Sequence, residues 1–515
     1  MGADVLTLTS LLAAGAAGAD AIRAPEQQAL SHGGLRQASG AIVAALRARG
    51  IGRAVRVALL LPNGPEMAVA FLGTASAAVA APLNPAYKRE ELDFYLGDLG
   101  AKAVIVMADE AGPIVAAAAT RGTTLIRLRP QAGGRAGLFA LDGPPLAAGA
   151  LPPEDQPAAS DVALVLHTSG TTSRPKQVPL THANLAASAR AIAATLQLTR
   201  ADAGLNVMPL FHIHGLIASL LAPLSAGGAV ICTKGFNALK FMGLLGSELA
   251  TWYSAVPTMH QAILERAQRQ PEAARGAGLR FVRSSSASLP PRVFGALAAT
   301  FGCPVIEAYG MTEASHQMTS NPLGAGRQKP GSVGLAAGPE VAIAAPDGRL
   351  AGAGSEGEIV IRGMSVTPGY AANPQANAEA FFDAGDGGGR WFRTGDLGVF
   401  DAEGYLTISG RIKELINRGG EKIAPREVDE VLMDHPAVAQ AVTFAVPHAK
   451  LGEEVAAAVV LRDGASASEG ELRAHAAIKL AAFKVPRQIV VVAEIPKGPT
   501  GKLQRIGLAK QLGLG

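Results

Sequence analysis

The chain of 515 residues is too long for one ordinary hydrophobic core, so two or more domains are expected. Hydrophobic residues make up 49% of the sequence and charged residues 17%, which is typical of a globular, soluble protein. The formal net charge is only +4 and no block of lysine or arginine stands out, so we expect no nucleic-acid partner.

The cysteine content and the N-terminus favour a cytoplasmic location and no membrane span. Cys232 and Cys303 are too few for a disulfide framework or a zinc site, and a reducing compartment fits them best. The N-terminal segment lacks the basic residues of a secretory signal. The longest hydrophobic stretch, 205–232, contains histidines, prolines and a Gly-Gly pair, so we predict a buried strand, helix and strand there.

The first two-thirds of the chain predicts an α/β fold. Short runs rich in β-branched residues alternate with alanine-rich stretches, as in a series of strands and helices. We predict a buried helix over 66–84 and strands over 56–64, 102–107, 124–128, 163–170, 228–233, 279–288 and 304–313. Such strands form mostly parallel sheets flanked by helices, in which ligands bind beyond the carboxyl ends of the strands.

From about Glu340 the pattern changes. Short alternating strands over 340–350, 357–363 and 404–411, joined by Asp-Gly or Gly turns, predict a small antiparallel subdomain. The stretch 410–425 leads into an α+β module with helices over 426–435 and 468–481 and strands over 438–446, 455–461 and 488–495. We therefore predict a large N-terminal domain, 1–411, and a small, mobile C-terminal domain, 412–515.

The segment "HTSGTTSRPKQVPLTH" (167–182) follows a buried strand with residues that do not build a core. The backbone N–H groups and hydroxyls of successive Ser, Thr and Gly residues can bind phosphate oxygens, and Lys176 can add positive charge. The alternative is a surface loop without a ligand. We favour an anion-binding loop at the carboxyl end of the strand.

Two further motifs allow either a function or a purely structural role. In "EAYGMTE" (307–313), an exposed Tyr309 could stack on a purine and Glu313 could bind Mg²⁺, or the segment could be a packed strand end. Asp396 and Arg411 could contact a ribose, or they could form a salt bridge at a turn.

The histidines are weak evidence for a metal. His212 and His214 would lie on one face of a strand, but no Cys, Asp or Glu nearby completes a site, so a metal is not expected there. Taken alone, a histidine such as His316 is more typical of a packed residue than of a catalytic one.

Taken together and in this order, the motifs resemble those of the adenylate-forming acyl-CoA synthetase family. The resemblance spans nearly the whole chain and includes "TSGTTSRPK", "YGMTE", "TGD", "GRIKELINRGGEKIAP" and "PKGPTGK". It implies a large N-terminal domain and a small C-terminal domain that rotates between two half-reactions. In the first, a carboxylate attacks the α-phosphate of Mg-ATP and gives acyl-AMP and pyrophosphate. In the second, the thiol of coenzyme A displaces AMP.

The resemblance also implies roles for individual residues. Mg²⁺ would be bound by Glu313 and Thr168, and the β- and γ-phosphates of ATP by Thr168, Ser169, Gly170, Thr171, Thr172 and Lys176. Adenine and the α-phosphate would be held by Glu307, Ala308, Tyr309, Gly310 and Thr312, and the ribose by Asp396 and Arg411. The catalytic residues would be Thr312, Glu313 and Lys502, of which Lys502 would bridge the carboxylate and the α-phosphate. Lys413 would be the hinge, and Gly419 and Gly420 would line the coenzyme A tunnel.

Within the family the chain most resembles the oxalate–CoA ligases, which share "PLFHxHGL", "RSxSASL" and "MTEAxHxM". Relatives for fatty or aromatic acids often have a small or apolar residue in place of Ser286 and usually lack His316. A second carboxylate needs hydrogen-bond donors because an unpaired buried charge is costly. Ser286 and His316, together with His212 or His214, are predicted to supply them.

Other functions fit the same resemblance. The chain could be a ligase for another short acid such as malonate or acetate, or for a medium-chain acid. It could also be a luciferase-like oxygenase or a non-catalytic AMP-binding relative. A monomer or a homodimer is expected, with ATP, coenzyme A and a carboxylic acid as its small-molecule partners.

Two loop residues depart from the commonest pattern of the family. Ser173 stands where many relatives have glycine, and the oxalate–CoA ligases share this serine. Gln177 also replaces a glycine. It is strained if the position needs a positive φ, and otherwise its amide forms a local hydrogen bond. The sequence leaves these two alternatives open.

Overall fold

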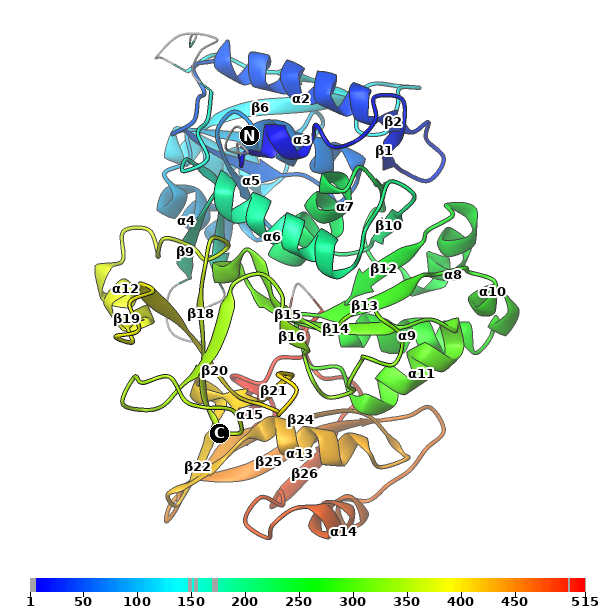
Figure 1. Cartoon of the computed structure of the whole chain (residues 1–515), viewed down its shortest axis with the longest axis vertical. Coiled ribbons are helices and arrows are strands. Elements are labelled where there is room, and N and C mark those ends of the chain that lie inside the picture. Colours follow the sequence, from blue (N-terminus) through cyan, green and yellow to red (C-terminus); the bar gives the residue numbers. More distant parts are fainter. Residues whose placement is uncertain (1–5, 147–150, 152–155, 169–174, 499–500, 515) are drawn as a thin grey trace.

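The computed structural model describes residues 6–146, 151, 156–168, 175–498 and 501–514. Their strands form four sheets, and the largest helix, α2 (His32–Arg47), lies at the opposite end of the molecule from the last sheet (Figure 1). No helix in these ranges combines the length and apolar character needed to cross a bilayer.

Two large sheets build the N-terminal part. The seven-stranded sheet, in the order β7-β6-β5-β3-β4-β8-β9, consists of β3 (Arg56–Leu60), β4 (Val79–Pro82), β5 (Ala103–Met107), β6 (Thr124–Pro130), β7 (Phe139–Asp142), β8 (Val162–Thr168) and β9 (Lys176–Thr181). The nine-stranded sheet, in the order β16-β15-β14-β13-β12-β10-β11-β1-β2, consists of β1 (Asp20–Arg23), β2 (Leu30–Ser31), β10 (Ala203–Asn206), β11 (Ala229–Cys232), β12 (Trp252–Ala255), β13 (Phe281–Ser285), β14 (Val305–Met311), β15 (His316–Ser320) and β16 (Leu335–Ala336). Their inner strands pair in parallel and the antiparallel pairs lie at the edges, which confirms the predicted α/β fold.

Helices cover both faces of each large sheet and give five layers. Along β3, Val57 and Leu59 face the layer between the sheets, whereas Ala58 and Leu60 face outward, as expected from the period of two in a strand. The central layer contains α2, α3 (Pro65–Ala75), α6 (His182–Thr195), the π-helix η1 (His214–Leu221) and α7 (Ala222–Ser225). The outer layers contain α4 (Arg89–Leu99) and α5 (Pro113–Arg121) on one side, and α8 (Ala238–Ser247), α9 (Pro257–Ala267), α10 (Pro271–Arg275) and α11 (Pro291–Phe301) on the other. The short α1 (Leu8–Leu11) packs on the central layer.

Two local predictions were wrong. The helix expected over 66–84 ends at Ala75, and the alanine-rich remainder forms β4, which pairs with β3 and β8. Pairing inside a buried sheet therefore outweighs the helix propensity of alanine here. His212 and His214 do not lie on a strand, because His212 belongs to a bend and His214 begins the π-helix η1.

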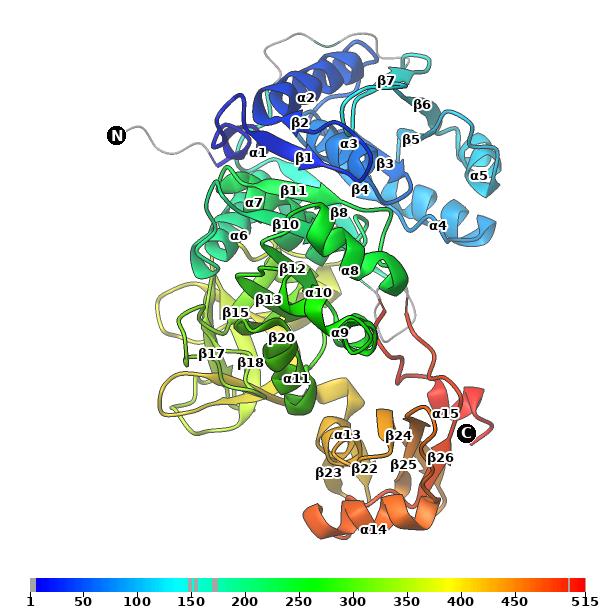
Figure 2. The same cartoon turned by 90° about the vertical axis from the view of Figure 1, so that its right-hand side faces the viewer.

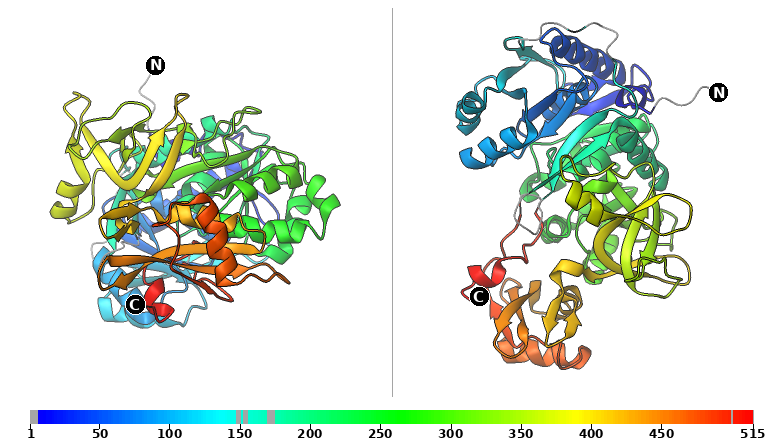
Figure 3. Two further views of the ribbon diagram at one scale, coloured as in Figure 1. Left: turned by 90° about the horizontal axis from the view of Figure 1, so that it is seen from below. Right: turned by 90° about the vertical axis from the view of Figure 1, so that its left-hand side faces the viewer.

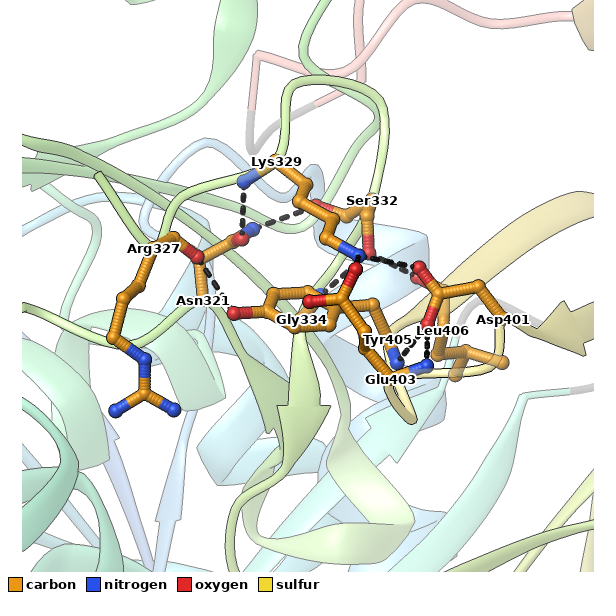
Figure 4. A network of polar contacts seen from close by, with 9 residues as sticks. All are labelled: Asn321, Arg327, Lys329, Ser332, Gly334, Asp401, Glu403, Tyr405 and Leu406. Carbon is orange, nitrogen blue, oxygen red and sulfur yellow. Dashed lines mark hydrogen bonds and ion pairs between the residues drawn. The ribbon is translucent and has the colours of Figure 1, made fainter.

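The predicted antiparallel subdomain is present. It consists of β17 (Glu340–Ala344), β18 (Gly357–Arg362), α12 (Pro374–Ala380), β19 (Phe381–Asp383), β20 (Arg390–Phe400) and β21 (Leu406–Arg411). The loop after β15 fastens it to the nine-stranded sheet (Figure 4). Lys329 in this loop donates to Asp401 and Glu403 at 2.7 and 2.8 Å, and Asn321 donates to the Glu307 carbonyl of β14 at 3.2 Å. The position of β20 and β21 relative to β14 is thus fixed.

The last sheet follows the short helix η3 (Ile412–Glu414) and lies apart from the others (Figures 2 and 3). It contains β22 (Ile416–Arg418), β23 (Glu421–Ile423), β24 (Val438–His448), β25 (Gly452–Leu461) and β26 (Gln488–Val491). The helices α13 (Pro425–Met433) and α14 (Glu469–Lys479) cover one face, and α15 (Leu508–Gln511) the other. After β26 the chain returns to the N-terminal sheets beside α9, where Thr258 donates to the Gly501 carbonyl at 2.7 Å.

Arg505 connects the segment after β26 to η3 and α13. Its guanidinium donates to Glu414 at 3.0 Å, to Asp429 at 2.8 Å and to the Thr443 carbonyl. Asp429 is buried, and burial raises the pKa of its carboxyl while the charge of Arg505 lowers it. The ion pairs therefore compensate a carboxylate that has little access to water.

Arg505→Met should destabilise the C-terminal domain by about 3 kcal/mol, because it leaves a buried carboxylate without its partner. Hydrogen exchange of the full-length chain, followed by mass spectrometry, should then be about a hundredfold faster in α13 and β24. The matched control is Lys484→Met. It removes an exposed ion pair with Glu427, which lies on α13 like Asp429, and should cost at most about 1 kcal/mol. Equal exchange rates in the two variants would contradict the role given to Arg505.

Candidate active site

The predicted site residues gather at the carboxyl ends of the central strands. Thr168 is the last residue of β8, Ser286 follows β13, and Thr312 follows β14. His212 lies shortly after β10, and His214 begins η1. This edge is where parallel α/β sheets bind ligands. The loop residues Ser169, Gly170, Thr171, Thr172 and Ser173 lie outside the described residues.

Asp396 joins the nine-stranded sheet to the antiparallel subdomain. Its carboxylate accepts a hydrogen bond from the Tyr309 hydroxyl at 2.5 Å and from Arg411 Nε at 2.6 Å, across the β20–β21 pair. Tyr309 is buried and not exposed as predicted, and burial followed by the charge of Asp396 raises the pKa of its phenol. The salt bridge considered as an alternative for Asp396 and Arg411 is therefore present.

Glu313 is a buried carboxylate at the start of the loop after β14, within η2 (Thr312–Ala314). The Tyr370 hydroxyl donates to it at 2.9 Å, and Lys176 Nζ lies 4.5 Å from the centre of the Tyr370 ring. Burial raises the pKa of Glu313, and the charges of Arg411 and Lys176 lower it. Within the described ranges, no three His, Cys, Asp or Glu side chains form a metal site by themselves. One carboxylate suits Mg²⁺ that is held mainly by nucleotide phosphates.

The strand β14 places Glu307, Ala308 and Gly310 beside Tyr309. Glu307 accepts from the Leu289 N–H at 2.9 Å, and burial raises the pKa of its carboxyl to about 7. The Ala308 carbonyl accepts from Ser285 at 2.8 Å. Gly310 has no room for a side chain, because a Cβ there would lie 1.8 Å from the His316 carbonyl oxygen and 2.7 Å from Nδ1 of the His316 ring. His316 therefore packs against β14 at a distance that only a glycine at position 310 permits.

Lys502 reaches this edge from the C-terminal segment. Burial and then the charge of Arg411 lower the pKa of Lys502 to about 8, against the opposing effect of Asp396 and Glu414. The Lys502 charge in turn adds to the burial that lowers the pKa of His212 to about 3. The Lys502 side chain is therefore near enough to Arg411 and His212 for their charges to affect one another.

The predicted acid-binding residues form one hydrogen-bonded cluster. His214 Nδ1 lies 3.0 Å from the Ser286 hydroxyl, and its Nε2 lies 2.6 Å from the Ser254 hydroxyl. The His214 and His316 rings are 4.8 Å apart, and burial lowers the pKa of both well below the usual value, so both are neutral at pH 7. Ser286 and His212 are partly exposed, whereas His214 and His316 are buried.

The backbone of this cluster is strained. Ser286, Ser315 and His316 have φ angles of 75°, 52° and 102°, in the left-handed region that side chains other than glycine rarely adopt. Ser188 donates to the Ser315 carbonyl at 2.6 Å, and Ser315 donates to the Ser365 carbonyl at 2.9 Å, which holds the turn in place. Strain maintained in this way is typical of functional sites.

Sequence reasoning missed Arg283, Ser254 and Tyr370. Arg283 lies in the middle of the buried strand β13, and its guanidinium is in contact with Ser254, His316 and Gln317. The available signal was an arginine, Arg283, inside the predicted buried strand 279–288. Nothing in the local sequence pointed to Ser254 or Tyr370, since both reach the site only through long-range packing.

The structure decides between the two alternatives for Gln177. Its φ is not positive, and it lies on β9 opposite His167. The Gln177 amide donates to the Asp98 carbonyl at 2.6 Å and to the Asp98 carboxylate at 2.8 Å, and His167 Nε2 lies 2.9 Å from the same carboxylate. The residue is therefore unstrained, and it ties the start of β9 to α4.

Lys413 and the glycine pair lie away from this cluster. Lys413 is exposed in η3, between Arg411 and β22. Gly419 and Gly420 form the turn between β22 and β23 with φ angles of 62° and 101°, and Gly419 N–H donates to the Leu451 carbonyl of the same sheet at 2.9 Å. The structure thus brings Lys502, and not the glycine turn, to the edge of the large sheets.

Known proteins match the chain over most of its length. The pattern of the AMP-binding enzyme family matches residues 12–371, and that of the AMP-binding enzyme C-terminal domain matches residues 427–502. The oxalate–CoA ligase of Arabidopsis thaliana is 47% identical over 87% of each chain, and that of Saccharomyces cerevisiae is 42% identical over 88% of this chain and 86% of the yeast protein. The structure of ATP-bound MatB from Rhodopseudomonas palustris superposes with a TM-score of 0.86 at 31% identity, covering 99% of this chain and 98% of MatB. The chain therefore belongs to the AMP-binding enzyme family, and the adenylate-forming acyl-CoA synthetases are the family that its motifs predicted.

Proposed function

We propose that this protein is an ATP-dependent acid–CoA ligase that adenylates oxalate and transfers the oxalyl group to coenzyme A, with release of AMP. The observation that carries the choice of acid is the cluster of Ser286, His214 and His316 at the strand ends, next to Lys502. These groups would leave a long acyl chain in contact with polar atoms, whereas a second carboxylate would satisfy them. The identity to oxalate–CoA ligases of two organisms supports the same choice.

In the first half-reaction, ATP would lie along the carboxyl edge between β8 and β14. The loop residues Thr168, Ser169, Gly170, Thr171, Thr172 and Lys176 would bind the β- and γ-phosphates. Glu313 and Thr168 would hold Mg²⁺, which neutralises phosphate charge when bound. Glu307, Ala308, Tyr309 and Gly310 would line the adenine site, Thr312 would contact the α-phosphate, and Asp396 and Arg411 would hold the ribose.

Lys502 would bring the two reactants together. A carboxylate oxygen of the acid attacks the α-phosphorus, and the bond to pyrophosphate breaks, so negative charge accumulates around the α-phosphate. The Lys502 ammonium would stabilise that charge and orient the carboxylate. Ser286, His316 and either His212 or His214 would bind the other end of the acid.

The second half-reaction would need another arrangement of the C-terminal domain, residues 412–515. Rotation about Lys413 would remove Lys502 from the edge of the sheets and bring in the Gly419–Gly420 turn beside the pantetheine arm of coenzyme A. The thiol sulfur then attacks the acyl carbon, and the bond to AMP breaks. The partly exposed η3 is short enough to absorb such a rotation.

The acid can be identified from pyrophosphate release with ATP, Mg²⁺ and a panel of oxalate, malonate, sulfoacetate and acetate. We expect kcat/KM to be about a hundredfold higher for oxalate than for acetate, because acetate leaves the second set of donors unpaired. Release of AMP should require coenzyme A. Turnover of acetate without turnover of oxalate would overturn the assignment, and no turnover of any acid would favour a non-catalytic relative.

Lys502→Ala should abolish adenylation and leave ATP binding nearly unchanged, since the lysine acts on charge that develops during the reaction. In the wild type, kcat/KM for oxalate should fall as the pH rises through about 8, because the ammonium form is lost above that pKa. Lys502→Arg stays protonated and should move this decline to higher pH. A wild-type profile that is flat from pH 7 to 9 would show that another group controls the step.

Ser286→Ala and His316→Ala should each lower kcat/KM for oxalate by about tenfold, which corresponds to about 1.4 kcal/mol. Initial rates at saturating ATP give this value, and the KM for ATP should not change. Ser288→Ala is the matched control, because Ser288 lies two residues further along and its hydroxyl has no partner among the described residues. Normal oxalate kinetics in both test variants would exclude these residues from the acid site.

A further inference from the structure

Arg283 is a buried cation without a buried anion. It is 0% exposed, and burial alone lowers its pKa to about 9, so the guanidinium keeps its charge at neutral pH. Among the residues that the structure describes, no carboxylate forms an ion pair with it. A charge in such surroundings is costly, which suggests that its compensation comes from a bound molecule.

The guanidinium faces the acid-binding cluster. Its Nη1 lies 3.2 Å from the Ser254 hydroxyl and 3.4 Å from Nε2 of His316, and its Nη2 donates to the Gln317 side-chain oxygen at 3.2 Å. Phe281 and Arg283 share the face of β13 that is directed toward the central layer, where η1 carries His214. The guanidinium therefore contacts both histidine rings, with Nη1 also 3.5 Å from Nε2 of His214, and it would act on the acid through them.

Arginine has only donors, so each group that the Arg283 guanidinium contacts must accept from it. Arg283 Nη1 also faces Nε2 of His214 at 3.5 Å, so this nitrogen must accept, and the Ser254 hydroxyl then donates to it at 2.6 Å. The proton of the neutral His214 ring must then lie on Nδ1, where it donates to the Ser286 oxygen at 3.0 Å. The Ser286 hydroxyl hydrogen, at the partly exposed end, remains available for an acceptor in the pocket.

The same rule applies to His316. Its Nε2 faces Arg283 at 3.4 Å and must accept, so its proton also lies on Nδ1, on the side of Gly310. Both rings are thus held as neutral donors that point away from Arg283. We name this set of Arg283, Ser254, His214 and Ser286 the donor relay.

We propose that Arg283 is a positioning residue that makes the enzyme select acids with a second anionic group. It orients the donor relay so that the pocket presents hydrogens and not lone pairs, and it supplies the positive charge that a second carboxylate compensates. Lys502 serves the reacting carboxylate and Arg283 the remote one, so the two cations match the two charges of oxalate. The inference rests on the proposed adenylation of oxalate, which it deepens.

Oxamate is the probe that isolates this effect. It has nearly the shape of oxalate, but a neutral amide with two N–H donors replaces the second carboxylate. In Arg283→Met the ratio of kcat/KM for oxalate to that for oxamate should fall about a hundredfold. This variant loses both the positive charge and the fixed direction of the hydrogen bonds in the donor relay. Arg283→Lys remains a charged donor and should keep the ratio within about tenfold of the wild type.

Two controls separate this role from simple destabilisation. Arg280 lies three residues before Arg283 and forms an ion pair with the buried Asp202. Arg280→Met breaks this pair, so it should lower the Tm but leave the oxalate-to-oxamate ratio within about twofold. The KM for ATP should stay the same in all these variants. Ser254→Ala interrupts the donor relay but keeps the charge, and it should lower the ratio by about tenfold. An unchanged ratio in Arg283→Met would overturn the proposal.

Nitrogen-15 NMR of the wild-type protein with labelled histidine gives a test that needs no turnover. At pH 7 both His214 and His316, assigned with their glutamine variants, should be neutral with the proton on Nδ1. Protons on Nε2 would overturn the proposal even if oxalate is the substrate. Conversely, Nδ1 protons in an enzyme that does not use oxalate would support the donor relay and overturn only the proposed acid.

Discussion

The carboxylate of Asp396 holds the site together, because it connects strands that belong to different sheets. It accepts from Tyr309 on β14 and from Arg411 on β21. The loop after β15 reinforces this connection through Lys329 and Asn321. Since η3 follows Arg411 directly, the same ion pair also fixes the point at which the C-terminal domain begins. The carboxyl end of β14 and the start of the C-terminal domain therefore share one anchor.

The charges around the site divide into compensated and uncompensated cations. Arg411 is neutralised by Asp396, and Arg505 by Glu414 and Asp429. Lys502 and Arg283 have no ion pair with a described carboxylate, and burial lowers the pKa of each. Buried cations without a partner are costly, and an anionic acid beside them would reduce that cost.

Much of the fold and the gathering of the candidate site residues followed from local patterns. Apolar runs with their flanking turns predicted the parallel strands, and the polar clusters after "ALVLH", "FVRSS" and "VIEAY" marked their carboxyl ends. What failed or stayed open depended on distant partners. The strand β4 forms because β3 and β8 flank it. The side-chain amide of Gln177 is satisfied because Asp98, 79 positions earlier, accepts its hydrogen bond. Sequence spacing cannot reveal such partners, and it left Arg283 unnoticed for the same reason.

The donor relay has a consequence for how acid preference can evolve. Pocket volume is set by the residues that line it, whereas the polarity of its hydrogen bonds is set by Arg283, which lies behind them. A single replacement at this hidden position could reverse the polarity while the contact surface keeps its shape. Related enzymes with nearly identical pocket walls can therefore prefer acids that differ in charge, and comparison of the walls alone would not reveal the difference.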